Sequence, residues 1–463
     1  MEVTVIGAGL AGSECALQLA KQGIKVNLYE MRPEKTTGAH TSADFAEFVC
    51  SNSLGSYDIT NASGLLKREM EMLGGELIKI AYECQVPAGG ALAIDRALFA
   101  QKVTKSIEEN ENINIIREEI TQIPNTPTVI ASGPLTSDLL ADSLKEFTQS
   151  EHLHFFDAIA PIVERESINF DVAFYANRYD KVDSCPLLLD EEKREGETEQ
   201  TIQPFNRSTP QPSYINCPMN KEQYEKFYNI LINAPKNELK EFEKDAKFFE
   251  SCLPVEVIAS RGIDTLRFGP MKPVGLIDKR TNEESWAVVQ LRQDNFAKTL
   301  YNLVGFQTNL KWGAQKELIQ SVPGLENANI VRYGVMHRNT FINSPKVLNS
   351  ALQAKNRADL FFAGQITGTE GYTESIATGL LAGLNMAKFL KGEELLKLPK
   401  ETILGALCDY ISFEEHKHFQ PINSNWGVIA PIELPKKDRK NKKLKNELLA
   451  NRSIEFLTKF MGE

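Results

Sequence analysis

Three glycines near the N-terminus are spaced for binding a dinucleotide. Gly7, Gly9 and Gly12 form the pattern G-x-G-x-x-G directly after the apolar run 3–6. In this pattern the glycines allow a tight turn, close approach of the backbone to a pyrophosphate, and close packing of helix on strand. Glu30 ends the next predicted strand, where a carboxylate can accept hydrogen bonds from an adenosine ribose. The predicted cofactor contacts in this region are Gly7, Ala8, Gly9, Leu10, Ala11, Gly12 and Glu30.

A second passage from strand to glycine to helix occurs far along the chain. The apolar run 360–363 stops at Gly364, and Gly371 opens a long predicted helix that starts with Tyr372. Two such passages suit FAD better than NAD, because the isoalloxazine ring lies well away from the adenosine. The helix N-terminus can also stabilise negative charge on a reduced flavin. We therefore predict contacts from Gly364, Gln365 and Gly371, with Tyr372 stacked on the flavin or covering its reactive face.

The elements that must position these residues predict a discontinuous domain. A chain of 463 residues is expected to form two or three domains. We predict an α/β fold: a Rossmann-like FAD-binding domain of the glutathione-reductase type at 1–160 and 331–463, with a smaller α/β domain inserted at 161–330. Within the insert, 182–212 is polar and aperiodic, which predicts an exposed, mobile insertion.

Composition limits the class of protein. The chain is 42% hydrophobic and 25% charged, with no run long enough to span a membrane, and it begins with a predicted core strand. We therefore expect a cytoplasmic protein. The net charge of −10 argues against a surface that binds nucleic acid all over. A local exception is 436–445, which has seven basic residues and one acid and is either a phosphate-binding segment or a solvated helix face.

The seven cysteines indicate reduced thiols. Their number is odd and their spacing irregular, so neither a disulfide framework nor a metal site is predicted. Three of them, Cys50, Cys217 and Cys252, lie in turn-like contexts.

Motifs along almost the whole chain, in order, carry a family resemblance. The chain resembles the bacterial folate- and FAD-dependent tRNA (uracil-5-)-methyltransferases. The matching segments are GAGLAGSE (7–14), FAEFVCSNSL (45–54), VPAGGALAIDR (86–96), SGPLTS (132–137), INCPM (215–219), FFESCLP (248–254), FGPMKPVGL (268–276), VQLR (289–292), RYGVMHRNT (332–340) and GQITG (364–368). The stretch 182–212 is a departure that resembles an insertion relative to the family.

The resemblance implies methylation of carbon 5 of a T-loop uridine in tRNA. Methylenetetrahydrofolate would supply the carbon, and NADPH or NADH would reduce FAD. No obligatory protein partner is implied. Carbon 5 of uracil is a poor nucleophile until a thiolate adds at carbon 6 and turns the ring into an enolate. A thiol is therefore needed beside the base.

By the same resemblance, the active-site thiols fall on Cys50 and Cys252. We expect Cys252 to attack carbon 6 and Cys50 to assist, by removing the carbon 5 proton or activating the nucleophile; the reverse assignment stays open. His337 and Arg338 follow a predicted strand, and we expect them to contact folate, with Arg338 paired to a carboxylate.

Four alternatives remain. The same chemistry could act on a ribosomal RNA uridine. A related flavoprotein modifies wobble uridines, but it carries a longer helical C-terminal extension than the residues after Gly364 allow. A flavin oxidoreductase acting on a small metabolite would have no need for two loop thiols or a basic segment. The non-enzymatic alternative is an RNA-binding protein that keeps a nucleotide as a structural ligand.

Overall fold

The structure is a computed structural model that describes residues 2–149, 153–180, 213–237, 253–282, 284–416, 419–435 and 437–462, with the backbone alone at 153–157, 180, 337 and 338. The predicted insertion 182–212 lies outside the described residues, as does Cys252. Within the described part of the chain, the strands form two six-stranded sheets and two smaller ones.

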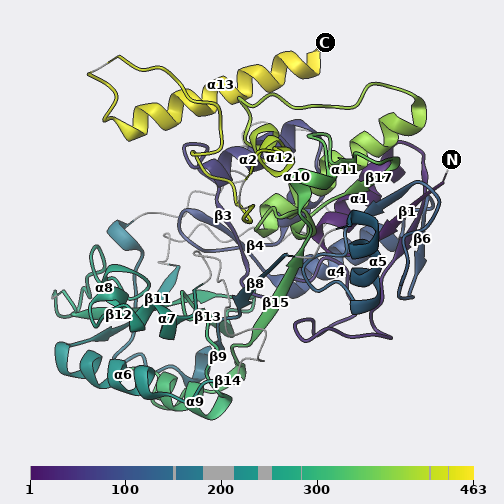
Figure 1. Cartoon of the computed structure of the whole chain (residues 1–463). Coiled ribbons are helices and arrows are strands. Elements are labelled where there is room, and N and C mark those ends of the chain that lie inside the picture. The colour runs from purple at the N-terminus through teal and green to yellow at the C-terminus, as the bar shows by residue number, and fades with distance from the viewer. Residues whose placement is uncertain are drawn as a thin grey trace, which may run out of the picture.

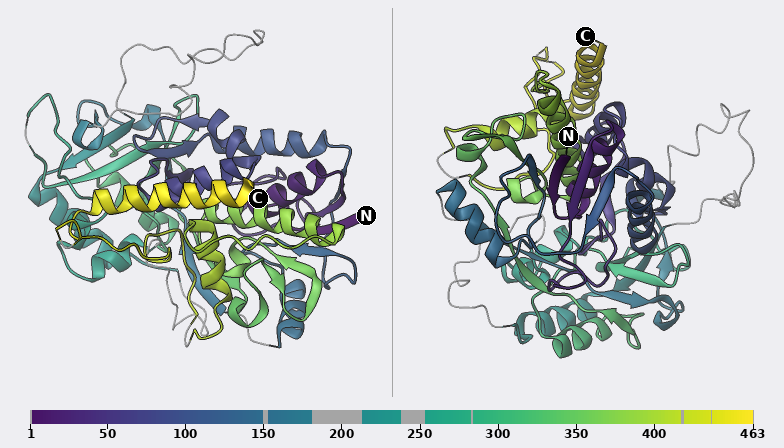
Figure 2. Two further views of the ribbon diagram at one scale, coloured as in Figure 1. Left: turned by 90° about the horizontal axis from the view of Figure 1, so that it is seen from above. Right: turned by 90° about the vertical axis from the view of Figure 1, so that its right-hand side faces the viewer.

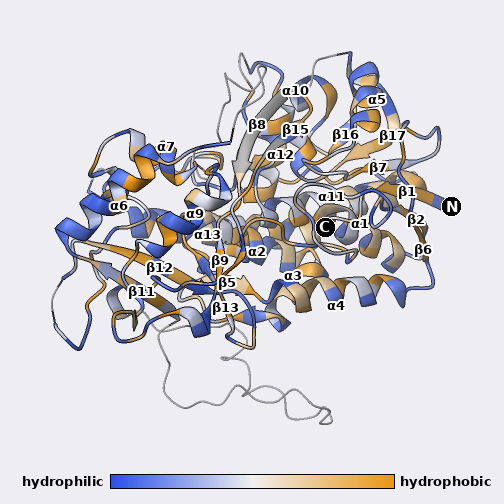
Figure 3. Ribbon diagram, turned by 90° about the horizontal axis from the view of Figure 1, so that it is seen from below, coloured by the Kyte–Doolittle hydropathy of each residue, from blue (hydrophilic) through white to orange (hydrophobic). Residues whose placement is uncertain are grey.

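The first sheet has the order β16-β17-β7-β1-β2-β6, in which the strands from β17 to β6 run parallel (Figure 1). These strands are β1 (Glu2–Ile6), β2 (Lys25–Tyr29), β6 (Ile113–Ile116), β7 (Thr128–Ile130), β16 (Gln353–Ala354) and β17 (Arg357–Phe362). The central strands are covered on both faces, so β7 is buried throughout and β17 ends in buried apolar residues; both strands appear largely orange in Figure 3. The predicted α/β fold with a parallel sheet is confirmed.

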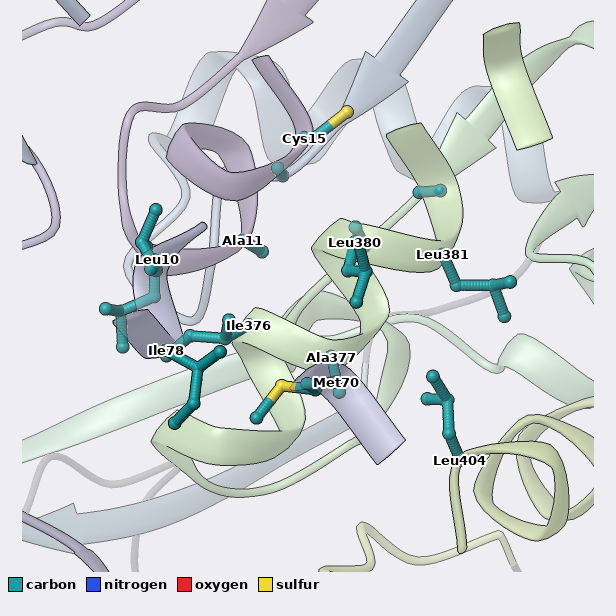
Figure 4. Close-up of a cluster of buried hydrophobic side chains, with 14 of the residues drawn as sticks. Leu10, Ala11, Cys15, Met70, Ile78, Ile376, Ala377, Leu380, Leu381 and Leu404 are labelled. Atoms are coloured by element: carbon teal, nitrogen blue, oxygen red, sulfur yellow. The ribbon is translucent and has the colours of Figure 1, made fainter. Parts of the chain in front are cut away.

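Two helices from distant parts of the chain pack closely beside this sheet. They are α1 (Leu10–Lys21) and α11 (Tyr372–Lys391). A Cβ atom at Gly379 would lie 2.2 Å from the carbonyl oxygen of Ala11, and one at Gly383 would lie 3.0 Å from that of Cys15. The glycines therefore allow the helices to approach to backbone contact. Apolar side chains fill the rest of the interface, as Figure 4 shows for Ile376 and Leu380.

Further elements surround the first sheet. The helices are α2 (Ala62–Met72), α3 (Leu77–Glu83), α4 (Arg96–Glu108), α5 (Asp138–Thr148), α10 (Ser344–Val347), α12 (Ile403–Ser412), α13 (Lys442–Gly462) and the 3-10 turn η7 (Gln365–Thr367). A small sheet of order β3-β5-β4 comprises β3 (Ser53–Ser56), β4 (Gln85–Val86) and β5 (Ala91–Ile94). No helix in the described part of the chain is long and apolar enough to cross a bilayer.

The second sheet has the order β10-β11-β12-β13-β9-β14, and its strands are antiparallel. They are β9 (Ile162–Glu164), β10 (Phe174–Tyr175), β11 (Tyr214–Met219), β12 (Ala287–Gln293), β13 (Leu300–Leu303) and β14 (Ile330–Arg332), with the 3-10 turns η1 (Arg165–Ser167) and η2 (Arg178–Asp180). Four helices share an apolar core with one face of the sheet, shown at the lower left of Figure 1. They are α6 (Lys221–Asn233), α7 (Val255–Ser260), α8 (Thr265–Phe268) and α9 (Trp312–Gln320). The opposite face carries polar residues such as Arg292 and Asn302 together with a small apolar cluster that includes Val288.

Two antiparallel strands connect the regions around the two sheets. The chain enters the second region through β8 (Leu153–Ala158) and returns through β15 (Met336–Phe341), which pairs with β8. The predicted domain boundaries at 161 and 330 stay a prediction.

A buried carboxylate joins the three helices α2, α12 and α13. Glu69 on α2 accepts hydrogen bonds from the N–H groups of Ile403 at 2.7 Å and Leu404 at 2.8 Å, and from the hydroxyl of Ser453 at 2.6 Å. It therefore caps α12 and anchors α13, which crosses the molecule in Figure 2. Burial raises the pKa of Glu69 to about 7, although the three hydrogen bonds lower it.

This carboxyl should make stability depend on pH. A carboxyl whose pKa rises on folding, here from 4.5 to about 7, binds its proton more tightly in the folded state. Its contribution to folding is complete below pH 4.5 and is lost as the pH rises to about 7. Relative to Glu69→Gln, the free energy of unfolding of the unmodified protein should fall by roughly 3 kcal/mol across this window. Urea unfolding at several pH values checks this, and parallel pH curves for the two proteins would contradict it.

Candidate active site

The glycine turn forms one wall of a cleft at the carboxyl ends of the parallel strands. After β1, Gly7 has a φ of +94°, which L-residues with side chains rarely adopt. A Cβ atom at Gly12 would lie 1.8 Å from the carbonyl oxygen of Gly7, so helix α1 can start here only with glycine. Gly9 is the N-cap residue of α1 and lines the cleft. The positive end of the helix dipole is therefore presented to any group bound there.

Glu30 lines the same cleft at the end of β2, and its orientation is fixed. One oxygen accepts a hydrogen bond from the N–H of Ala8 at 3.1 Å, and Arg32 donates to both carboxylate oxygens at 3.0 and 3.2 Å. Burial raises the pKa of Glu30, but the bonds from Arg32 and Ala8 outweigh it, so the pKa lies below its usual value. The carboxylate is thus ionised, and its remaining lone pairs can accept ribose hydroxyls.

The cleft continues toward the second glycine passage. Gly364, which follows β17, has a φ of +78° and sits so near α1 that a Cβ atom would lie 2.8 Å from that of Ala11. Gln365, Tyr372 and Ser375 line this end, and the cleft holds about 1010 Å³ of atom-free space, part of it open to solvent. An elongated dinucleotide fits this arrangement: a helix N-terminus for phosphates, a fixed acid beyond it, and a second helix N-terminus at the far end.

A thiol lies against a phenol beside the far end of the cleft. The hydroxyl of Tyr372, the first residue of α11, accepts a hydrogen bond from the backbone N–H of Cys50 at 2.7 Å and lies 2.9 Å from the Cys50 sulfur. Burial raises the pKa of Tyr372 well above its usual value, so the phenol keeps its proton. Because the N–H occupies an acceptor site on the oxygen, the phenol hydrogen is available to the sulfur. Tyr372 therefore positions Cys50 and can stabilise its thiolate.

Removing this hydroxyl should slow reactions of the Cys50 thiolate. In Tyr372→Phe the charge-assisted hydrogen bond is lost while the ring still packs on Phe48, whose ring centre lies 4.3 Å away. A hydrogen bond to a charged group contributes about 1.5–3 kcal/mol, so we expect alkylation of Cys50 by iodoacetamide at neutral pH to slow by roughly tenfold or more. Peptide mass spectrometry measures the rate. Cys408, which is buried, serves as the internal reference in the same digest. An unchanged rate of Cys50 alkylation in Tyr372→Phe would show that the phenol does not stabilise the Cys50 thiolate.

The structure gathers most of the predicted cofactor residues around one cleft. Those that line it are Gly7, Gly9, Leu10, Ala11, Glu30, Gly364, Gln365 and Tyr372. Three others support it: Ala8 donates to Glu30, Gly12 packs on Gly7, and Gly371 is the N-cap residue of α11. His337 and Arg338 lie in β15, which pairs with β8, and the structure describes only their backbone. Their contacts with folate, like the role of Cys252, stay predictions.

The sequence reasoning missed the polar groups that lock the cysteine loop in place. Asn52, two residues after Cys50, donates to the carbonyl oxygens of Ile94 and Gln293 and accepts a hydrogen bond from Arg292. Arg96 at the start of α4 pairs with Asp294 beyond β12 at 2.6 Å. The loop therefore rests against the second sheet. The only available signal was the position of Asn52 within the motif around Cys50.

The described residues include no group of three or more His, Cys, Asp or Glu side chains that could hold a metal ion. The described site holds a thiol against a phenol beside the cleft.

Comparisons with known proteins agree with this geometry. The model of the family GIDA, glucose inhibited division protein A, matches residues 2–203 and 183–394. The methylenetetrahydrofolate--tRNA-(uracil-5-)-methyltransferase TrmFO of Anoxybacillus flavithermus is 55% identical over 461 residues, which cover 100% of this chain and 99% of the relative. The protein of the same name from Bacillus cytotoxicus is 54% identical over 460 residues, 99% of each chain.

Among solved structures, GidA of Aquifex aeolicus superposes with a TM-score of 0.69 at 18% identity, covering 99% of this chain and 73% of that one. This likeness concerns the fold. The family resemblance of the motifs is confirmed by the full-length identity to the curated relatives. The chain belongs to the GIDA family and, within it, to the TrmFO proteins.

Proposed function

We propose that this chain transfers a one-carbon unit from methylenetetrahydrofolate to carbon 5 of a T-loop uridine in tRNA, with FAD as resident cofactor and NADPH or NADH as reductant. The observation that carries the proposal is the Cys50–Tyr372 pair at one end of a dinucleotide cleft. It is supported by full-length identity to proteins named for this reaction. The proposed place of action is the cytoplasm.

The cleft between the glycine turn and Tyr372 is here called the first cleft. Its residues would hold FAD along the length of the cofactor. The N-terminus of α1 would bind the pyrophosphate, and Glu30 would accept the ribose hydroxyls. The N-terminus of α11 would face the flavin ring, beside Tyr372. When bound, FAD supplies the electrons that reduce the transferred methylene carbon to a methyl group.

The thiols would act on the base. We assign the attack on carbon 6 of uracil to Cys252 and removal of the carbon 5 proton, or activation of the nucleophile, to Cys50; the exchanged roles are the alternative. Tyr372 would keep Cys50 oriented through its two contacts. Arg338, with His337, would bind the folate, with the guanidinium facing a carboxylate.

A basic segment at the start of α13 would contact the RNA backbone. Its side chains at Lys440, Lys442 and Lys443 are exposed, and Asn446 donates to the carbonyl oxygen of Thr60, in the loop after β3. That loop follows the cysteine motif by a few residues. Cations beside it can bind tRNA phosphates while the base reaches the thiols.

Transfer of labelled carbon tests the proposed function. The FAD-loaded protein would receive NADPH, methylenetetrahydrofolate labelled in its methylene group, and tRNA from cells that lack this methyl group. We expect label at carbon 5 of a T-loop uridine, and none when S-adenosylmethionine replaces the folate. Label in a ribosomal RNA fragment but not in tRNA would favour the ribosomal alternative. Absence of label from both RNAs would refute the methyl transfer.

A further inference from the structure

We propose that a second hollow beside Cys50 binds the target uracil ring, and that Asn302 and Arg292 donate hydrogen bonds to its carbonyl oxygen at carbon 4. This inference rests on the proposed function. The hollow, here called the base pocket, contains about 450 Å³ of atom-free space, part of it open to solvent. It is lined by Cys50, Ser51, Ala158, Ala160, Arg292, Asn302, Val304, Gly305 and Gln307.

The two donors come from neighbouring strands of the second sheet. Arg292 on β12 lies directly opposite Asn302 on β13 in the antiparallel register. Directly opposed residues project on the same face, with Cβ atoms about 5 Å apart. Leu291 and Leu303, one position along each strand, belong to the apolar core on the other face. Arg292 and Asn302 therefore project together from the face opposite this core, on the side where Cys50 lies.

The side-chain amide of Asn302 is a buried donor without a hydrogen-bond partner among the described residues. The residue is 2% exposed. A buried donor without a partner is destabilising, and buried amides are normally bonded. By contrast, Asn216 on the same sheet donates to carbonyl oxygens of Phe174, Ala176 and Tyr214. Of these two asparagines, only Asn302 therefore has an amide N–H that is available to a ligand.

Arg292 is held in a fixed position relative to the thiol. Its Nε donates to the side-chain oxygen of Asn52 at 2.9 Å, and the amide of Asn52 is in turn bonded to two backbone carbonyl oxygens at 3.0 and 2.9 Å. Because Asn52 is two residues from Cys50, this contact sets the position of the guanidinium against the cysteine loop. A rigidly held cation can stabilise charge that develops on a nearby atom.

Uracil activation requires donors at this place. When a thiolate adds to carbon 6, a carbon–sulfur bond forms and the π pair of the C5–C6 bond moves to carbon 5 and, by conjugation, to the oxygen on carbon 4. No group leaves, and the negative charge passes from sulfur to the enolate. Donors aimed at that oxygen bind the enolate more strongly than the neutral ring, and they thereby accelerate the addition. Asn302 and Arg292 would act as this oxyanion-stabilising pair.

The pterin ring of folate also carries a cyclic amide, so it is the competing occupant. The uracil assignment is favoured because Cys50 lines the base pocket, and the thiol has its function at the uracil ring. The first cleft, lined by Tyr372, is left for the flavin and for groups that stack on it. The test must therefore separate an effect on the base from an effect on folate.

The experiment measures covalent adduct formation between the protein and a tRNA T-arm that contains 5-fluorouridine at the target position. Protein loaded with FAD and supplied with NADPH and methylenetetrahydrofolate is followed by a denaturing gel shift. For Asn302→Ala we expect adduct formation to slow by about 100-fold, with the KM for methylenetetrahydrofolate and the FAD content unchanged. Asn302→Asp, which keeps the shape but replaces the donor by an acceptor, should show the same loss if Asn302→Ala is unstable. Gln290→Ala is the matched control, because Gln290 lies on the same face two residues from Arg292 but does not line the base pocket.

Each other outcome has a defined meaning. A raised KM for methylenetetrahydrofolate with normal adduct formation would place the pterin in the base pocket and overturn the proposal. Normal adduct formation in both Asn302 variants would overturn it as well, while leaving methyl transfer by the unmodified protein intact. Equal losses in Gln290→Ala would attribute the effect to general damage of the sheet, against the proposal. If the unmodified protein neither forms the adduct nor transfers labelled carbon, the proposed function fails together with this inference.

Discussion

Cys50→Ala should reduce methyl transfer to tRNA by about 100-fold to 10,000-fold while leaving the FAD content unchanged. The sulfur of Cys50 lies 2.9 Å from the Tyr372 hydroxyl and lines the base pocket. Loss of a group that transfers a proton at the reacting atom typically has an effect of this size. FAD should stay bound because Cys50 does not line the first cleft. Initial rates of label incorporation, with flavin absorbance as the second readout, measure both quantities.

Cys217→Ala is the matched control for this variant. Cys217 is fully buried in the core of the second sheet, and burial raises the pKa of its thiol, so it stays protonated and inert. Its removal should leave turnover within a few-fold of the unmodified rate. Full activity in Cys50→Ala, or equal losses in the two variants, would contradict a chemical role for Cys50.

Gly9→Ala should yield a folded protein that binds FAD roughly 10- to 100-fold more weakly. A Cβ atom at Gly9 would meet no protein atom within 4 Å, so folding tolerates it. Gly9 lines the first cleft, and the added methyl would occupy space that the pyrophosphate needs; overpacking of this kind costs about 1–3 kcal/mol. Titration of the apoprotein with FAD, followed by flavin fluorescence, gives the affinity. Unchanged affinity would place the cofactor elsewhere.

Alanine variants at two other glycines serve as comparisons for Gly9→Ala. At Gly12 an added Cβ would lie 1.8 Å from the carbonyl oxygen of Gly7, so Gly12→Ala should lower thermal stability as well as FAD binding. At Gly313, in the exposed face of α9, a Cβ would meet no atom within 4 Å, and Gly313→Ala should leave FAD binding unchanged. If all three variants bound FAD equally, the glycine turn would have no special role.

Local patterns in the sequence predicted the nucleotide side of the molecule well. The glycine turn, Glu30 and the helix from Tyr372 each depend on residues close together in the chain, where periodicity and turn chemistry are informative. The start of α4 is local in the same way: Asp95 is its N-cap residue, and its side chain accepts a hydrogen bond from the N–H of Leu98. These features can be read without knowing any long-range contact.

The contacts that complete the site join distant parts of the chain, and single-sequence patterns do not encode them. The Cys50–Tyr372 pair spans 322 positions, and Asn52 meets Arg292 across 240. The pairing of Arg292 with Asn302 depends on strand register, and one residue of slip would turn Asn302 to the opposite face. The resemblance to a family indicated that Cys50 is functional, but the geometry around it could come only from the fold.

The flavin content of the purified protein tests the central claim most directly. The proposed methyl transfer requires FAD in the cleft between the glycine turn and Tyr372. We predict a yellow protein with FAD in amounts equal to the protein chains, whose absorbance bleaches on addition of NADPH or NADH under anaerobic conditions. Protein that stays colourless after incubation with excess FAD would contradict the account.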